Sequence, residues 1–253
     1  MPIIFATLLA SLIGWNGILR KKLEYNDQLK NEFISSVSHE LRNPLSVING
    51  YTEFIHETEN LPKEKRQECA NEIHSAIEHL LNLIKDLEDI SRIESGKMDV
   101  SIKKLNLYDE FQKIPAMLQM QANNHSIEIN QLPFNHELEI LADSRRMQQV
   151  LINLISNAIK YGNDNTHVDI QTEENDNVVC ITIIDQGQGI SEDKLSQIFI
   201  PFNRLGAEKT SVKGTGIGLA LSKRLIEIMN GKIGVSSIVG EGTRFWFELP
   251  KAR

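Results

Sequence analysis

The chain opens on an uncharged, strongly apolar segment, because the first charged residue after the N-terminus is Arg20. As a helix, residues 2–19 would be ~27 Å long, close to the ~30 Å hydrocarbon core of a bilayer. The basic cluster 20–22 follows at once, and such a cluster favours the cytoplasmic side. The pattern predicts a transmembrane helix over 1–20, single-pass in a cell inner membrane or plasma membrane, with the rest of the chain in the cytoplasm. A signal peptide or a buried soluble helix fits less well, because the charge follows the apolar run and the run is apolar nearly all round.

Two amphipathic helical patterns follow, from 23 to about 57 and from 70 to 87, with residues 60–62 interrupting them. The second pattern steps by three and four through Ala70, Ile73, Ile77, Leu80, Ile84 and Leu87. This is a heptad seam, and a lone hairpin cannot cover its own seam, whereas two copies form a four-helix bundle. We therefore expect a homodimer. Taken alone, the periodicity would favour a continuous coiled coil with no other role.

Near Ser95 and Gly96 the pattern changes to short alternating runs separated by helical stretches and glycines. Adjacent runs are expected to form hairpins: 126–130 with 137–141, 166–173 with 178–184, and 232–237 with 243–249. The predicted fold class is α+β, with an N-terminal transmembrane helix (1–20), a helical-hairpin domain that forms a dimeric four-helix bundle (21–97), and an α/β-sandwich domain with a mixed sheet (98–253).

Composition excludes several classes of protein. With 41% hydrophobic and 24% charged residues among 253, the chain is too apolar to be disordered. Its net charge of -7 has the wrong sign for gripping nucleic-acid phosphates, so we expect no nucleic-acid partner. Cys69 and Cys180 lie far apart without metal-ligand spacing, which argues against structural zinc.

Two clusters in the last domain combine polar residues with a defined spacing. The segment NLISNAIKY places Asn153, Asn157 and Tyr161 on one helical face, with Lys160 beside them, and amides on one face can hold a hydrated metal and phosphate oxygens. The segment DQGQGI puts Asp185 at the end of an apolar strand, before two glycines that let backbone approach a ligand. Taken singly, a solvated helix face and a plain turn explain them as well.

Two further clusters lie closer to the C-terminus. In IFIPFNR, Phe199 and Phe202 precede the polar segment 205–213, which predicts a hinged flap anchored by these two aromatics, with core aromatics as the alternative. GTGIGL at 214–219 runs into a helical stretch and offers N–H groups to an anion. No P-loop occurs, and Leu219 stands where a dinucleotide motif has its last glycine, so both of those nucleotide folds fit poorly.

In this order the four clusters resemble the N, G1, F and G2 boxes of the sensor histidine kinases, whose ATPase superfamily includes gyrase and the heat-shock chaperone ATPases. FISSVSHELRNPLSVI at 33–48 is similar to the H box of that family. The resemblance covers about 20–253. It implies a protein-histidine kinase in which His39 accepts the phosphoryl group of Mg-ATP and passes it to an aspartate of a response regulator.

The resemblance also implies roles for single residues. Asp185 would recognise the adenine amino group, Asn157 with Asn153 would hold Mg²⁺, Lys160 and Tyr161 would line phosphate and base, and 205–213 would be the ATP lid. The remaining implied nucleotide contacts are Gly187, Gly189, Ile190, Phe199, Arg204, Lys213, Gly214, Thr215, Gly216, Gly218 and Leu219.

The chemistry of the H box follows from its residues. An exposed His39 offers a nucleophilic ring nitrogen, and Glu40 can take or orient the ring proton. Pro44 withholds a donor from the carbonyl of Glu40, which predicts a kinked or easily bent helix. Asn43 lies one turn after His39, resembles the family motif for dephosphorylating the regulator, and could orient a water molecule. Alternatively, Asn43 merely precedes the proline.

Two other functions are alternatives: a non-catalytic interaction module with a degenerate ATPase domain, and an ATPase without phosphotransfer. The intact boxes and the H box disfavour them. The stimulus, the cognate regulator, the size of any phosphatase activity, and phosphorylation in cis or in trans stay open. About a dozen residues separate the expected membrane helix from the H box, too few for the signalling module often found there in this family. Three alternatives therefore stay open: the signal arrives through the membrane helix itself, it arrives through a membrane partner, or the chain is N-terminally shortened.

Overall fold

The computed structural model describes residues 20, 31, 33–114, 116–131, 135–205 and 214–252. The predicted membrane helix lies outside these residues except for Arg20, and so do Lys213 and nearly all of the predicted lid. None of the helices within the described ranges is long and apolar enough to cross a membrane. The chain divides into two compact units, Met1–Leu80 and Leu81–Arg253.

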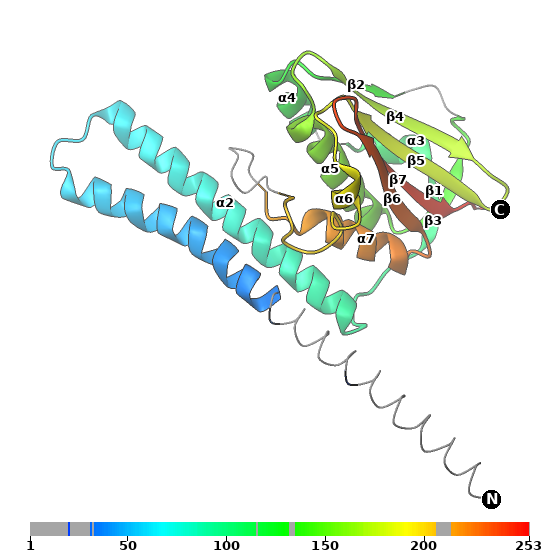
Figure 1. The fold of residues 1–253 in the computed structure, drawn as a ribbon, viewed down its shortest axis with the longest axis horizontal. Coiled ribbons are helices and arrows are strands. Elements are labelled where there is room, and N and C mark those ends of the chain that lie inside the picture. The colour runs from blue at the N-terminus through cyan, green and yellow to red at the C-terminus, as the bar shows by residue number, and fades with distance from the viewer. Residues whose placement is uncertain are drawn as a thin grey trace, which may run out of the picture. The chain divides into compact units, whose positions relative to one another are not determined.

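A helical hairpin precedes the sheet domain, as predicted (Figure 1). Its first helix is described over 33–57, and its second, α2, spans Lys63–Glu94. The first helix continues through Pro44, which is buried, so the proline does not end it. The turn between the helices contains Leu61, whose side chain is also buried.

The stripe that α2 buries differs from the predicted seam. Cys69, Ala76, Leu83 and Ile90, spaced seven apart, are buried. Of the predicted seam, Ala70 is exposed, and Ile77 and Ile84 are 40% and 42% exposed. These exposed fractions belong to a single chain, whereas the predicted seam is expected to be covered by a second copy, so they do not contradict it.

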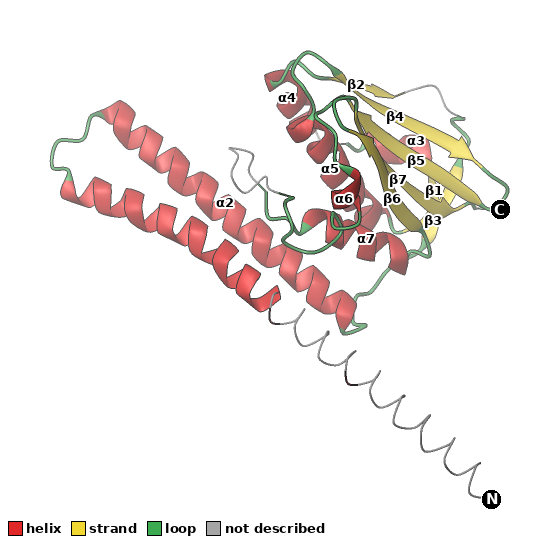
Figure 2. Ribbon diagram, viewed as in Figure 1, coloured by secondary structure: helices red, strands yellow, loops and turns green. Residues whose placement is uncertain are grey.

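The second unit is a two-layer α/β sandwich (Figure 2). Its five-stranded sheet has the order β2-β4-β5-β7-β6, in which only the β2–β4 pair is parallel. The predicted mixed sheet is therefore confirmed. The strands are β1 (Lys103–Asn106), β2 (Glu128–Gln131), β3 (Glu139–Ala142), β4 (His167–Glu174), β5 (Val178–Asp185), β6 (Lys232–Ile238) and β7 (Gly242–Pro250).

Helices α4, α5 and α7 cover one face of this sheet (Figure 2). Strand β5 explains why, because every second residue, from Val179 through Ile183 to Asp185, is buried. Alternation of this kind gives a strand one core face. The helices are α3 (Leu107–Gln112), α4 (Ala116–Asn124), α5 (Ser144–Tyr161), α6 (Glu192–Leu195) and α7 (Gly218–Ile228).

One of the three predicted hairpins is wrong. β2 pairs with β4 in parallel, while β3 pairs with β1 in a separate two-stranded sheet. A parallel pair needs a crossover connection, which β3 and α5 supply between β2 and β4. The β4–β5 and β6–β7 hairpins are confirmed.

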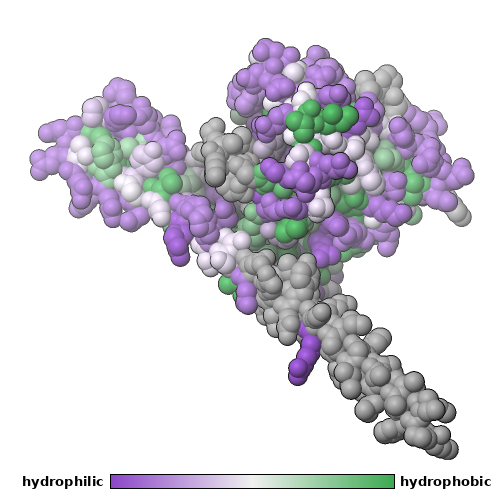
Figure 3. Space-filling view, viewed as in Figure 1, coloured by the Kyte–Doolittle hydropathy of each residue, from purple (hydrophilic) through white to green (hydrophobic). Residues whose placement is uncertain are grey.

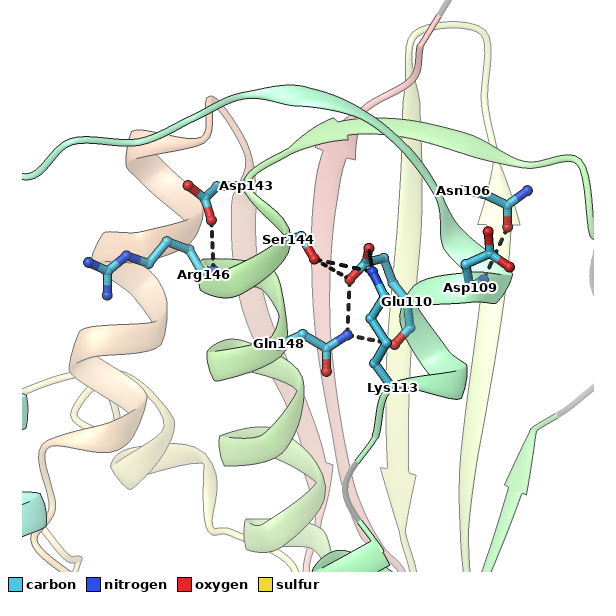
Figure 4. A network of polar contacts seen from close by, with 8 residues as sticks. All are labelled: Asn106, Asp109, Glu110, Lys113, Asp143, Ser144, Arg146 and Gln148. Carbon is cyan, nitrogen blue, oxygen red and sulfur yellow. Dashed lines mark hydrogen bonds and ion pairs between the residues drawn. The ribbon is translucent and has the colours of Figure 1, made fainter.

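Polar contacts hold the start of α5 (Figure 4). Asp143 caps the helix, accepting a hydrogen bond from the backbone N–H of Arg146 at 3.1 Å. Glu110, 1% exposed, accepts hydrogen bonds from Ser144 Oγ at 2.8 Å and from Gln148 Nε2 at 3.1 Å. These bonds satisfy a buried carboxylate and place α5 against α3.

Candidate active site

His39 lies on the exposed face of its helix, with 67% of its side chain accessible. Glu40 Oε1 lies 3.7 Å from His39 Nδ1, and Asn43 Nδ2 lies 3.5 Å from the same nitrogen. Within the described ranges, both contacts involve Nδ1 and neither involves Nε2. Nε2 is therefore the ring nitrogen available to a substrate.

The face of α5 that carries the predicted N box is ordered as the spacing implied. Asn153, Asn157 and Tyr161 occupy successive turns and are partly exposed, and Lys160 is exposed beside them. Carboxamide oxygens are hard ligands that Mg²⁺ accepts together with water and phosphate. The donor set on this face therefore fits a hydrated Mg²⁺ ion bound to a nucleotide.

Two cationic side chains influence each other beside this face. Loss of surrounding water lowers the pKa of Lys160, and the positive charge of Arg204 lowers it further. The charge of the predicted F-box arginine thus acts on the predicted N-box lysine. Because like charges repel, an anion placed between them would be stabilised by both.

Asp185 is 4% exposed at the end of β5, and its two carboxylate oxygens have different surroundings. Oδ1 accepts hydrogen bonds from the backbone N–H groups of Gly187 at 2.9 Å and Thr243 at 3.1 Å. No described residue donates to Oδ2. Burial raises the pKa of Asp185, while the two hydrogen bonds lower it. A fixed carboxylate with one open oxygen can accept a hydrogen bond from one amino group.

The loop after Asp185 is held between the end of α5 and β6. A Cβ at Gly187 would lie 2.1 Å from the carbonyl oxygen of Tyr161, so no side chain fits there. Gly189 has a φ of +70°, which favours glycine. Ile190 donates its backbone N–H to Ser237 Oγ at 2.8 Å. Of the predicted G1 residues, Gly187 therefore contacts the helix that carries the N box, and Gly189 and Ile190 contact the strand β6.

The turn before α7 and the first turn of that helix hold the predicted G2 residues Gly214, Thr215, Gly216, Gly218 and Leu219. A Cβ at Gly218 would lie 2.3 Å from Asn153 Oδ1, so the two helices approach closely at this point. Gly216 accepts a hydrogen bond from the backbone N–H of Phe202 at 2.9 Å. This turn therefore joins the predicted N and F segments.

Phe199 contacts α7, because Lys223 Nζ lies 5.5 Å from the centroid of its ring. Within this segment Ile198 is buried at 2% exposure, and the predicted anchors Phe199 and Phe202 are partly exposed. Lys213 and most of the predicted lid lie outside the described residues.

Three polar residues around the site belong to none of the predicted motifs. Thr243 donates its N–H to Asp185, and its Oγ1 lies 3.0 Å from Ser237 Oγ. Ser222, 2% exposed, accepts a hydrogen bond from Asn153 Nδ2 at 2.8 Å. Each of the three is a hydroxyl in a mostly apolar strand or helix, which is the signal that could have drawn attention to it.

Comparison with known families identifies both parts of the chain. Residues 29–96 match the "His Kinase A (phospho-acceptor) domain", and residues 142–253 match the "Histidine kinase-, DNA gyrase B-, and HSP90-like ATPase" family. The chain belongs to the sensor histidine kinases.

Individual relatives agree with this assignment. The chain is 35% identical to the sensor histidine kinase GacS of Pseudomonas protegens over 244 residues, which is 93% of this chain and 26% of GacS. The chain therefore spans about a quarter of that relative.

Solved structures of histidine kinases share the fold. ThkA in complex with the response regulator TrrA has a TM-score of 0.69 at 25% identity, covering 87% of this chain and 61% of that one. Full-length ShkA in complex with AMPPNP has a TM-score of 0.63 at 29% identity, covering 87% of this chain and 46% of that one.

Proposed function

We propose that this chain transfers the γ-phosphoryl group of ATP to Nε2 of His39 and then to an aspartate of a response regulator. The observation that carries the proposal is the geometry at His39, where Glu40 and Asn43 both approach Nδ1 and leave Nε2 available. The open Oδ2 of buried Asp185 supplies an acceptor for an adenine amino group in the same chain. The family assignment and the regulator complex of ThkA support this reading.

In the first step, the Nε2 lone pair attacks the γ-phosphorus. The N–P bond forms as the bond from the γ-phosphorus to the bridging oxygen breaks, and ADP leaves. Glu40 accepts the Nδ1 proton, so that the ring does not keep a positive charge. In the second step, a carboxylate oxygen of the regulator attacks the phosphorus, the N–P bond breaks, and the ring regains its proton.

The ATP-binding unit orients and neutralises the nucleotide. Asn153 and Asn157 would hold Mg²⁺ through their carboxamide oxygens, and the metal supplies positive charge to the phosphate oxygens as negative charge develops on the leaving group. Lys160 and Arg204 provide further positive charge near that helix face. Asp185 accepts the adenine amino group through Oδ2.

Labelling with γ-labelled ATP tests the first step. Label on the wild-type chain should be lost in mild acid and survive alkali, as a phosphoramidate does, and His39→Gln should carry none. Asn157→Ala should also fail to label while keeping its oligomeric state, because it removes a metal-side oxygen and no core contact. Acid-stable label on His39→Gln would instead point to Ser35, Ser36 or Ser38.

A second activity, dephosphorylation of the regulator, is favoured by the position of Asn43. Its carboxamide lies on the same helix face as His39, one turn away, with Nδ2 3.5 Å from the ring. An amide there can orient a water molecule toward the aspartyl phosphate of a docked regulator without itself reacting. Asn43→Ala should keep autophosphorylation within a few-fold and slow regulator dephosphorylation about tenfold, a barrier change of ~1.4 kcal/mol. Equal loss of both rates would remove Asn43 from this role.

The assembly we propose is a homodimer formed through the hairpin. Exposed apolar side chains of α2, namely Ile77, Leu81 and Ile84, form a stripe that a second copy can cover. Both hairpin helices also line a groove that includes Val47, Phe54 and Cys69, and Figure 3 shows hydrophobic surface near the hairpin turn.

Attachment to the membrane is a proposal that the sequence of residues 1–20 alone supports. In cells, the whole chain should sediment with membranes, whereas a chain that begins at residue 21 should not. Recovery of both chains in the same fraction would contradict it.

A further inference from the structure

Ser222 is a buried hydroxyl between two helices of the ATP-binding unit. It lies in the second turn of α7 at 2% exposure, among the buried apolar residues Ala220, Leu221 and Leu225. A hydroxyl in such surroundings needs a hydrogen-bond partner. Its partner is Asn153 of α5, whose Nδ2 donates to Ser222 Oγ at 2.8 Å.

The opposite end of the Asn153 carboxamide is also constrained. Oδ1 lies over Gly218, so close that a Cβ there would be 2.3 Å from it. The side chain is thus placed by α7 at both ends, with its nitrogen on Ser222 and its oxygen over the first turn of the helix. Only the oxygen of a carboxamide can ligate a cation. Because Ser222 binds the nitrogen of the Asn153 carboxamide, the oxygen stays available as a ligand.

We propose that Ser222 is a positioning residue for the magnesium–nucleotide site: by accepting the hydrogen bond from Asn153 Nδ2, it keeps Asn153 Oδ1 directed to the metal. The inference rests on the proposed function, in which Asn153 and Asn157 hold Mg²⁺. Ser222 lies outside the glycine turn, and through its hydrogen bond it links the metal ligand Asn153 on α5 to α7, the helix that follows the turn. Asn157 has no such support from the residues that the structure describes, so Asn153 is the fixed ligand of the pair.

The test measures ATP binding to the whole chain by calorimetric titration, in Mg²⁺ and in EDTA. Ser222→Ala removes only the hydroxyl and should weaken binding about five- to tenfold in Mg²⁺ while leaving binding in EDTA unchanged. The Mg²⁺ concentration that gives half-maximal binding should rise by a similar factor. In an Asn153→Ala background, Ser222→Ala should have no further effect on the magnesium-dependent part, because the group it positions is gone.

Ile226→Val is the matched control, because it removes one methyl group from a buried position on α7 and leaves the Ser222 hydroxyl in place. It should leave the magnesium dependence unchanged, which separates the loss of a positioned ligand from a loosened helix. If Ser222→Ala fails to fold, Ser222→Cys replaces it in the test. The Cys side chain is of similar size but is a weak hydrogen-bond acceptor, so it should shift the magnesium dependence in the same direction.

The outcomes separate the inference from the proposed function. Equal weakening in Mg²⁺ and EDTA, or no weakening at all, overturns the role of Ser222. If Mg²⁺ does not strengthen ATP binding even in the wild-type chain, the proposed metal site fails first, and the role of Ser222 fails with it. Because the readout is binding, the inference stands or falls independently of label on His39.

Discussion

Arg146 Nη1 lies 3.2 Å from both carboxylate oxygens of Asp89, and both side chains are almost fully buried. Gln149 completes the arrangement, since its Nε2 donates to Asp89 Oδ2 at 3.0 Å and its Oε1 accepts from Arg146 at 3.1 Å. The contact joins the last turns of α2 to the first turn of α5 within the second unit. Charges buried in this way are retained only when they are paired and hydrogen-bonded.

Breaking this pair should destabilise the second unit. We expect Asp89→Leu to lower the free energy of unfolding by about 3 kcal/mol, because it leaves the guanidinium buried without a counter-ion. The double variant Asp89→Leu with Arg146→Met should lose much less. Denaturant unfolding measures both. The exposed Lys65–Glu68 pair, 2.8 Å apart, is the control, and Glu68→Gln should cost less than about 0.5 kcal/mol.

Asp86 should make stability depend on pH in the opposite direction to most carboxylates. Burial and the neighbouring charge of Asp89 raise the pKa of Asp86 from 3.8 to about 6. The folded chain therefore binds this proton more tightly than the unfolded chain does, so the contribution of Asp86 to stability falls as pH rises through 6.

We expect Asp86→Asn to raise the free energy of unfolding at pH 7.5 by about 1 to 2 kcal/mol, with the gain shrinking between pH 6 and pH 4. Denaturant midpoints at several pH values measure this. Asp99→Asn, at an exposed position, is the matched control and should have no comparable effect. A gain that grows as the pH falls would refute the sign.

Asp185→Asn should change base preference and leave the fold intact. The Asn oxygen can still accept the N–H groups of Gly187 and Thr243, but the nitrogen that replaces Oδ2 donates and cannot accept an amino group. It can, however, donate to the carbonyl that guanine carries at the equivalent position. The ratio of ATP to GTP affinity should therefore fall at least about tenfold.

Competition binding with the two nucleotides measures that ratio. Asp169→Asn is the control, because Asp169 is a partly buried carboxylate on the neighbouring strand β4 that bonds Asn130 instead. An unchanged ratio in Asp185→Asn would mean that this carboxylate does not read the base.

The apolar stripe of α2 should govern association. Ile77→Asp places a charge at a side chain that is 40% exposed in the single chain, so it should cost the monomer little but abolish the dimer. Sedimentation velocity distinguishes the two states. Asn82→Asp introduces the same charge at an exposed polar position of α2 and should leave the dimer intact. A dimeric Ile77→Asp chain would place the interface elsewhere.

The sequence was most informative where chemistry restricts the residue. Gly187 and Gly218 are glycines because backbone or a side chain occupies the space of a Cβ, and Asp185 ends an apolar strand whose alternation is plain. The heptad spacing of α2 could also be predicted from the sequence. Which stripe of α2 is buried within one chain could not. Hairpin pairing failed at β2 and β3 because proximity in sequence carries no information about a crossover.

Contacts between residues far apart in the sequence could not be predicted from the sequence. Ser222 and Asn153 lie 69 residues apart, Thr243 and Asp185 58 apart, and Arg146 and Asp89 57 apart. A lone Ser, Thr or Arg in a helix or strand has many uses, and its partner becomes known only when the chain is folded.

Helix α5 has one further consequence for the energetics of the molecule. Its 18 residues form a rod ~27 Å long, held at its start by Asp89 and Glu110 and touched at its end by Gly187 beneath the Tyr161 carbonyl. Thermodynamic linkage is reciprocal. If nucleotide binding stabilises or weakens the Asp89 contact by a given free energy, then forming that contact changes the free energy of nucleotide binding by the same amount.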